Sequence, residues 1–229
     1  MEKLNNIRFD DWSEKAISNP LMKGSTIEYL FPVKFEKYCK IFHPFCLSPD
    51  YEKMKDEYWA YSEEDNLVDL DSYLPKPLKI LAQILGHNFD KRYSTEKIVS
   101  VFGRRQPKWF LYPAEGTLDS LILPQLTKLL SKYSKSQICY FHYVQYAIST
   151  YETTIFKGVV SELPKTVQVG FAGTPNTVWP ESKEWYLYTN FDADYTLIGG
   201  RKDMINEILS SEEIEALEWD LNDIFYLED

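Results

Sequence analysis

The chain has 229 residues, of which 44% are hydrophobic and 16% aromatic, so its apolar mass excludes a disordered chain. Its 35 acidic residues against 25 Lys and Arg give a net charge of −10, which repels phosphate backbones and disfavours general nucleic-acid binding. The same charge attracts basic partners, although many proteins are acidic merely for solubility.

The first 75 residues predict strands and an irregular insertion. Residues 27–31 look like a strand before Pro32, and residues 35–42 are expected to pair with it in antiparallel fashion. Tyr51 to Asp71 mixes charges with aromatic residues and predicts an exposed, irregular insertion. We expect one domain over residues 1–229, with a separate lobe over residues 1–75 left open.

Three helices are predicted next. The first covers residues 78–85 and stops at Gly86 in a left-handed conformation. The second covers residues 95–102 behind a Ser94 cap. The third begins at Pro124 and has an apolar face. That face consists of Leu126, Leu129, Leu130 and Tyr133.

From residue 137 the pattern changes to strands. Four are expected, over residues 138–144, 153–160, 166–171 and 185–191. A fifth over residues 195–198 precedes a helix through residue 209, and a short helix from Ser210 or Ser211 is favoured by a Ser210–Glu213 capping box. Strands without crossover helices predict an α+β fold, a largely antiparallel mixed sheet with helices mainly on one face.

The start of the chain and its cysteines favour a reducing compartment. Residues 1–7 lack the apolar run of a signal peptide, and no later stretch approaches a membrane span. Cys39, Cys46 and Cys139 are odd in number and sparse, which suits buried thiols better than a disulfide framework. We expect a cytoplasmic protein with no membrane partner.

Few residues suggest chemistry. Gly199-Gly200 before Arg201-Lys202 could hold an anion at a helix N-terminus, but the nucleotide-loop glycine spacing is missing and a tight turn is favoured. Asp192 and Asp194 could act as paired carboxylates, yet solvated turn residues are the better interpretation.

The histidines and cysteines do not predict a metal site. Cys39, His43 and Cys46 superficially suggest zinc, but their spacing is not that of a structural site and no second pair completes it. We expect His43 to be packed at a turn. No serine-hydrolase elbow, kinase motif or metalloprotease motif is present, so no catalytic residue, cofactor or metal is predicted.

A resemblance covers most of the chain and is most specific over residues 179–200. Trp179-Pro180 with Trp185, followed by Thr189, Asp192 and Thr196 to Gly200, resembles a Trp-Pro, Trp, Thr-x-x-Asp, Thr-x-Val/Ile-Gly-Gly motif of a family of uncharacterised bacterial proteins. Leu197 and residues 143–145 depart from that family's pattern. The resemblance bears on the fold and on the domain boundaries of the chain, and it implies no activity, because none is established for that family.

Acidity, many Tyr and Trp residues and no catalytic constellation favour a non-enzymatic protein-binding module, specifically an immunity-type protein that neutralises a cognate toxin. Trp179, Trp185 and Tyr188 are the candidate partner-binding residues, and a packed hairpin core is their alternative interpretation.

The alternative function is an enzyme or small-ligand binder with a polar site at one rim of the sheet, near the Gly199-Gly200 turn. Its candidate ligand residues are Asp192, Asp194, Arg201 and Lys202.

Overall fold

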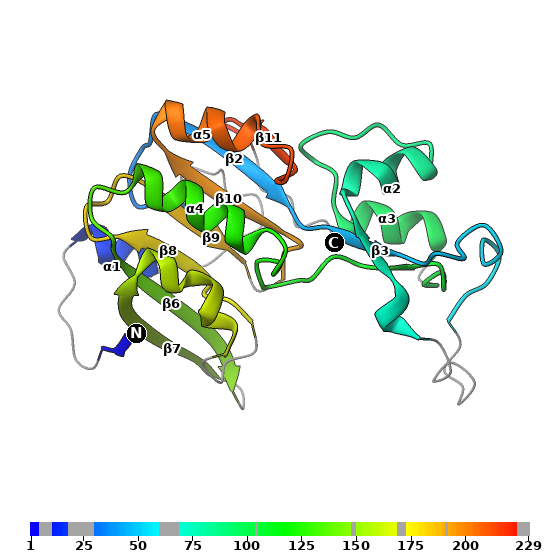
Figure 1. Cartoon of the computed structure of the whole chain (residues 1–229), viewed down its shortest axis with the longest axis horizontal. Coiled ribbons are helices and arrows are strands. Elements are labelled where there is room, and N and C mark those ends of the chain that lie inside the picture. The colour runs from blue at the N-terminus through cyan, green and yellow to red at the C-terminus, as the bar shows by residue number, and fades with distance from the viewer. Residues whose placement is uncertain are drawn as a thin grey trace.

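The computed structural model has two lobes, each built on its own antiparallel sheet (Figure 1). The structure describes residues 1–4, 11–17, 30–59, 69–103, 105–147, 150–168, 173–190 and 192–223. The expected α+β architecture is confirmed. None of the helices within these ranges has the length and apolar character needed to cross a membrane.

The large lobe contains an eight-stranded sheet. Its strands, in spatial order, are β1 (Glu2–Lys3), β7 (Thr150–Val159), β6 (Ile138–Ala147), β8 (Thr177–Pro180), β9 (Tyr186–Thr189), β10 (Tyr195–Gly200), β2 (Lys37–Phe42) and β11 (Ala216–Trp219). β8, β9 and β10 are neighbours in the sheet in the order of the sequence. β6 lies next to β8, and β7 pairs with the other edge of β6. β2 is the exception, because it inserts from far away between β10 and β11.

The helices lie mainly on one face of this sheet, as expected (Figure 1). They are α4 (Leu123–Tyr133), α5 (Lys202–Leu209) and the 3-10 helix η4 (Val160–Gln168). Their apolar sides pack on strand residues such as Ile41, Leu187 and Ile198 to form the largest core cluster. Burial of these aliphatic side chains is the main source of stability of the large lobe.

The opposite face of the same sheet is aromatic. Because strand residues alternate between faces, Tyr186 and Tyr188 of β9 point away from Leu187. They join Tyr195 and Trp219 in a second cluster. α1 (Asp11–Ile17) lies on this side, where its Trp12 ring is 6.0 Å from that of Trp179. Both faces of the central strands are therefore buried.

The small lobe is formed by residues between β2 and α4 (Figure 1). Its sheet has the order β4 (Leu74–Lys76), β3 (Phe45–Leu47) and β5 (Phe110–Leu111), and α2 (Leu78–Ile84) and α3 (Thr95–Phe102) pack on it. Its core includes Phe45, Leu81 and Phe110 together with Phe42 at the end of β2. The lobe therefore does not have the 1–75 bounds left open by the sequence, since β2 belongs to the large sheet.

The first four predicted helices are present as α2 to α5. Gly86 after α2 has φ +68°, and Ser94 caps α3 by accepting a hydrogen bond from the Lys97 amide. α4 begins at Leu123 with Pro124 in its first turn.

Two predicted strands need correction. β2 pairs with β10 on one side and β11 on the other, so it has no edge for residues 27–31. Of that predicted strand, residues 27–29 lie outside the described residues, and Leu30 and Phe31 form a turn and a bend. Thr166 belongs to η4, and residues 169–171 lie outside the described ranges. The predicted irregular insertion at 51–71 agrees with the structure where it is described, since residues 51–59 and 69–71 form turns, bends and the start of the short 3-10 helix η3 (Leu70–Ser72).

The last predicted helix is a strand. The Ser210 hydroxyl donates to the Glu207 carbonyl instead of capping a new helix, and the Glu213 amide is bound by Ser211. β11 then forms at residue 216, because pairing with β2 satisfies its backbone groups.

Candidate functional site

The three rings predicted to bind a partner are buried. Trp179 and Trp185 are fully buried and Tyr188 is 8% exposed. They do not share a surface, because Trp179 and Tyr188 lie in the aromatic cluster and Trp185 lies under the helices, where its Nε1 donates to Ser134 Oγ at 2.8 Å. The structure therefore places these rings in the packed core that was the alternative interpretation.

The four candidate ligand residues do not form one rim. Asp192 and Asp194 precede β10, whereas Arg201 and Lys202 follow it, so the six residues of the strand separate the two pairs. Arg201 Nη2 binds its neighbour Asp203 at 2.6 Å. A single polar site made of all four residues is therefore not present.

The Gly199-Gly200 pair is not a turn but the end of β10. A methyl group at Gly199 would lie 2.7 Å from the Phe35 ring and 2.8 Å from the Tyr38 ring, and one at Gly200 would lie 2.3 Å from Met204. The Phe35 and Tyr38 rings therefore leave no room for a side chain at Gly199, whereas at Gly200 the flexible end of Met204 lies closest.

Asp194 joins the two lobes. Its carboxylate is 5% exposed and accepts hydrogen bonds from the amide and hydroxyl of Thr95, at the start of α3, at 2.7 and 2.5 Å. Both donors are fixed by the fold, and two such bonds satisfy a buried charge. This arrangement explains Asp194 as a structural residue.

His43 is packed at the end of β2, with both ring nitrogens engaged. A carbonyl can only accept, so Nδ1 donates to the Ala114 carbonyl at 2.8 Å, and Nε2 accepts from the Thr196 hydroxyl at 3.0 Å. The Thr189 hydroxyl is 2.7 Å from that of Thr196 and extends this series of hydrogen bonds. Burial lowers the pKa of His43, so the ring is neutral.

A metal site is not seen around these residues. Among the described residues, no group of three His, Cys, Asp or Glu side chains is arranged to hold an ion. Cys39 and Cys139 are buried thiols, and burial raises the pKa of each.

Lys40 is a buried amine that sequence reasoning missed. It is 2% exposed, and its Nζ donates to the carbonyls of Lys91 and Tyr93 at 3.1 and 2.9 Å. The same atom lies 3.9 Å from the centre of the Tyr195 ring and 5.1 Å from that of Trp219. These contacts connect β2 to the small lobe and leave the amine no access to a substrate.

The charge of the molecule is concentrated in its last 27 residues. Residues 203–229 contain ten acidic residues and no Lys, Arg or His. Since the chain has 35 acidic residues and 25 Lys and Arg, the preceding 202 residues hold 25 of each and carry no net charge. We call residues 203–229 the acidic segment; the structure describes it to residue 223.

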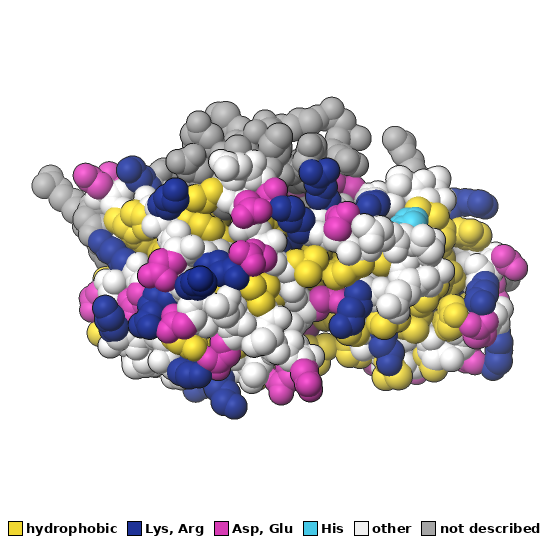
Figure 2. Space-filling view, turned by 90° about the horizontal axis from the view of Figure 1, so that it is seen from above, with side chains coloured by type: hydrophobic (Ala, Val, Ile, Leu, Met, Phe, Trp, Pro, Cys, Tyr) yellow, Lys and Arg dark blue, Asp and Glu magenta, His cyan; other side chains and the backbone are white. Residues whose placement is uncertain are grey.

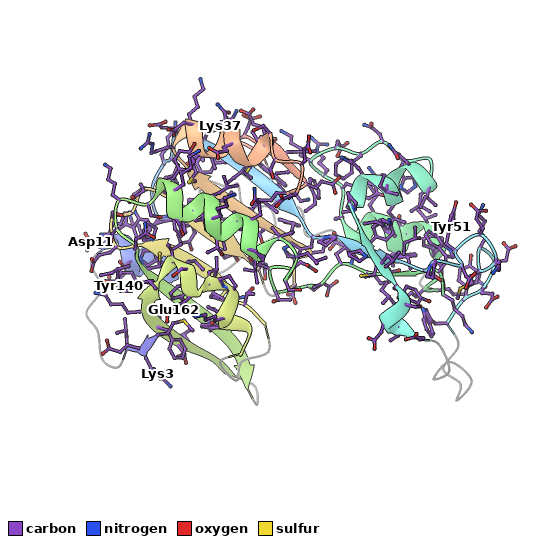
Figure 3. The ribbon with its side chains drawn as sticks, viewed as in Figure 1. Lys3, Asp11, Lys37, Tyr51, Tyr140 and Glu162 are labelled. Atoms are coloured by element: carbon purple, nitrogen blue, oxygen red, sulfur yellow. The ribbon has the colours of Figure 1, made fainter. Side chains whose placement is uncertain are left out.

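Several acids of this segment pair with bases from earlier in the chain. The pairs are Asp203 with Arg201, Glu207 with Lys132, Glu218 with Lys37, and Asp220 and Asp223 with Lys91. Figure 3 shows Lys37 at the outer end of the large lobe, far from Tyr51 at the tip of the small lobe. Glu212 and Glu213, in the turn after α5, are exposed and form no ion pair with a described residue.

That turn forms one wall of a groove between the lobes. The groove encloses about 440 Å³, which is in the range of ligand pockets. It is lined by Phe42, Pro44, residues 75–77, Lys79 and residues 121–122 and 211–215. Viewed from above, the lower outline of the molecule is indented between the two lobes (Figure 2).

Glu215 fixes the geometry of the groove. Its carboxylate accepts a hydrogen bond from the Lys79 amide in the first turn of α2 at 3.2 Å, and its carbonyl accepts from the Phe42 amide at 2.9 Å. Burial raises the pKa of Glu215. The Glu215 carboxylate thus joins the wall from the large lobe to the Lys79 amide of the small lobe, while the bond to Phe42 fixes Glu215 on β2.

Comparison with known proteins identifies no relative: no protein-family model, curated protein or solved structure matches the chain.

Proposed function

We propose that this chain is a non-enzymatic protein-binding module of the immunity type, which neutralises a basic toxin by covering it. The observation that carries the proposal is the separation of charge along the chain. All of the net charge of −10 arises from the acidic segment.

A one-sided acidic field speeds the encounter with a basic protein and orients it before contact. Glu212 and Glu213 are suited to this role, because their exposed carboxylates are not paired with described bases. Acids that are already paired contribute less, since a partner must displace the existing cation.

An enzyme or small-ligand site at Gly199-Gly200 has less support. The side chains of Tyr38 and Met204 occupy the space next to the two glycines. The four candidate polar residues are divided between the two ends of β10. The groove between the lobes lies elsewhere.

The test is affinity capture of the tagged chain from its native cells, with identification of what binds in stoichiometric amount. The charge variant is E212Q/E213Q, and the matched control is D56N/E57Q, which removes two exposed acids from the small lobe. We expect one basic partner whose association slows several-fold with E212Q/E213Q and with added salt, but not with D56N/E57Q.

Co-expression provides the functional measurement. The chain should restore growth of cells that produce the captured partner, and E212Q/E213Q should restore it less well. The absence of a stoichiometric partner, or a partner whose capture is indifferent to both salt and E212Q/E213Q, contradicts the proposal.

A further inference from the structure

The groove between the lobes has an apolar floor. Pro44, Pro75, Pro77 and Leu121 line it. Leu121 is 57% exposed, although it lies beside fully packed residues at the start of α4. Proline lacks an amide donor, so this floor offers a ligand apolar contact and few hydrogen bonds.

The two walls of the groove carry opposite charges. Glu212 and Glu213 stand on the α5–β11 turn, and Lys76 and Lys79 stand at the β4–α2 junction. None of these four side chains forms an ion pair with a described residue. Across an apolar floor, such walls favour a ligand with a cation on one side and an anion on the other.

We propose that this groove docks a short protein segment in which an aliphatic side chain lies between a Lys or Arg and an Asp or Glu. The aliphatic side chain covers Leu121, the base faces Glu212 and Glu213, and the acid faces Lys76 and Lys79. This inference deepens the proposed protein-binding function and rests on it for the identity of the partner.

Charge complementarity selects this occupant over others. A uniformly basic segment leaves the two lysines opposed by like charge, and a uniformly acidic segment does the same to the two glutamates. A purely apolar ligand leaves both walls without a counter-charge. The hydrogen bond between Glu215 and the Lys79 amide holds the walls in place, so little ordering is needed on binding.

The test uses synthetic peptides with the full chain. The probes are Arg-Leu-Pro-Leu-Glu with blocked ends, the same peptide in reverse order, and versions in which Arg or Glu is replaced by Gln. Binding is followed by amide NMR shifts. We expect saturable shifts at residues 121–122 and 211–215, with the peptide that carries both charges binding tightest.

Matched variants assign each contact. E212Q/E213Q should weaken only Arg-bearing peptides, and K76Q/K79Q only Glu-bearing ones, which is the pattern of a double-mutant cycle. L121S should weaken every peptide about five- to tenfold. The control variant V101S changes an exposed apolar residue of α3. Val101 is 48% exposed, against 57% for Leu121, and V101S should leave the affinity unchanged.

Three results overturn the inference: no saturable shift up to about 1 mM peptide, shifts that lie outside the groove, or equal loss for all peptides with both charge variants. The outcomes separate the two proposals. If the L121S variant binds a captured partner normally, docking in the groove is refuted and the proposed protein-binding function is retained. Peptide binding in the groove without any captured partner refutes the function and leaves the groove standing.

Discussion

Lys40 is expected to make stability depend on pH in the neutral to alkaline range. Its amine is buried between β2 and the small lobe, where burial lowers its pKa from 10.5 to about 7. In the unfolded chain the same amine is in water and keeps its ordinary pKa. Between these two values the folded protein holds Lys40 neutral while the unfolded chain holds it charged.

The sign follows from proton binding. The unfolded chain binds one more proton than the folded protein in this window, so the contribution of Lys40 to stability rises with pH; it is lost progressively as pH falls from about 10.5 to about 7 and is constant below that. The slope for one such proton is about 1.4 kcal/mol per pH unit, so the gain from pH 7.5 to pH 9.5 is about 3 kcal/mol.

The variant K40M isolates this effect. Met is close in length to Lys and does not titrate. K40M leaves the Lys91 and Tyr93 carbonyls unpaired, which lowers the free energy of unfolding by about 1–3 kcal/mol at every pH. Urea unfolding of both proteins at several pH values, with reductant present, gives the difference in free energy of unfolding. That difference should increase in favour of the natural chain as pH rises.

Taking the difference between the natural chain and K40M also cancels the titration of groups that both proteins share. Cys39 and Cys139 have raised pKa values and oppose the trend above about pH 9, but they contribute equally to the two proteins. A difference that stays flat from pH 7 to 9 refutes the reasoning. It would show that the two carbonyls and the Tyr195 ring keep Lys40 charged in the folded protein.

Two further predictions concern residues whose roles were reassigned by the structure. G199A should destabilise the protein by about 1–3 kcal/mol, because its methyl group collides with the Phe35 and Tyr38 rings; chemical denaturation measures this, and a neutral result would mean that the rings move aside. T95V should destabilise by about 1–3 kcal/mol, because it removes the hydroxyl donor to buried Asp194. Amide hydrogen exchange should then rise first in α3, and unchanged protection there would contradict the role of Asp194 in joining the lobes.

Local patterns predicted α2 to α5 well, whereas α1 was not predicted and part of η4 was predicted as strand. The Ser94 cap, the Gly86 stop and the Pro124 start each act through bonds within a few residues, and the structure confirms all three. The continuous run of aromatic and β-branched residues likewise located β6, and the strand expected at 195–198 is β10.

What sequence reasoning missed depends on residues distant in the chain. β11 was predicted as a helix because Ser210 and Glu213 match a capping box, but pairing with β2 decides its conformation. Lys40 sits where strand alternation permits a solvated side chain, and it is buried only because Tyr195 and Trp219 cover it. The groove likewise arises from four separate segments, so no single stretch of sequence indicates it.

The position of β2 has a consequence for synthesis of the chain. A ribosome releases β2 long before the strands on either side of it, because β2 ends at Phe42 whereas β10 begins at Tyr195 and β11 at Ala216. During translation β2 must wait with Cys39 and Ile41 uncovered, while β6 to β9 can already pair with one another. Closure of the large sheet is therefore a late, long-range event, and nascent chains that end before residue 195 should be the species most in need of a chaperone.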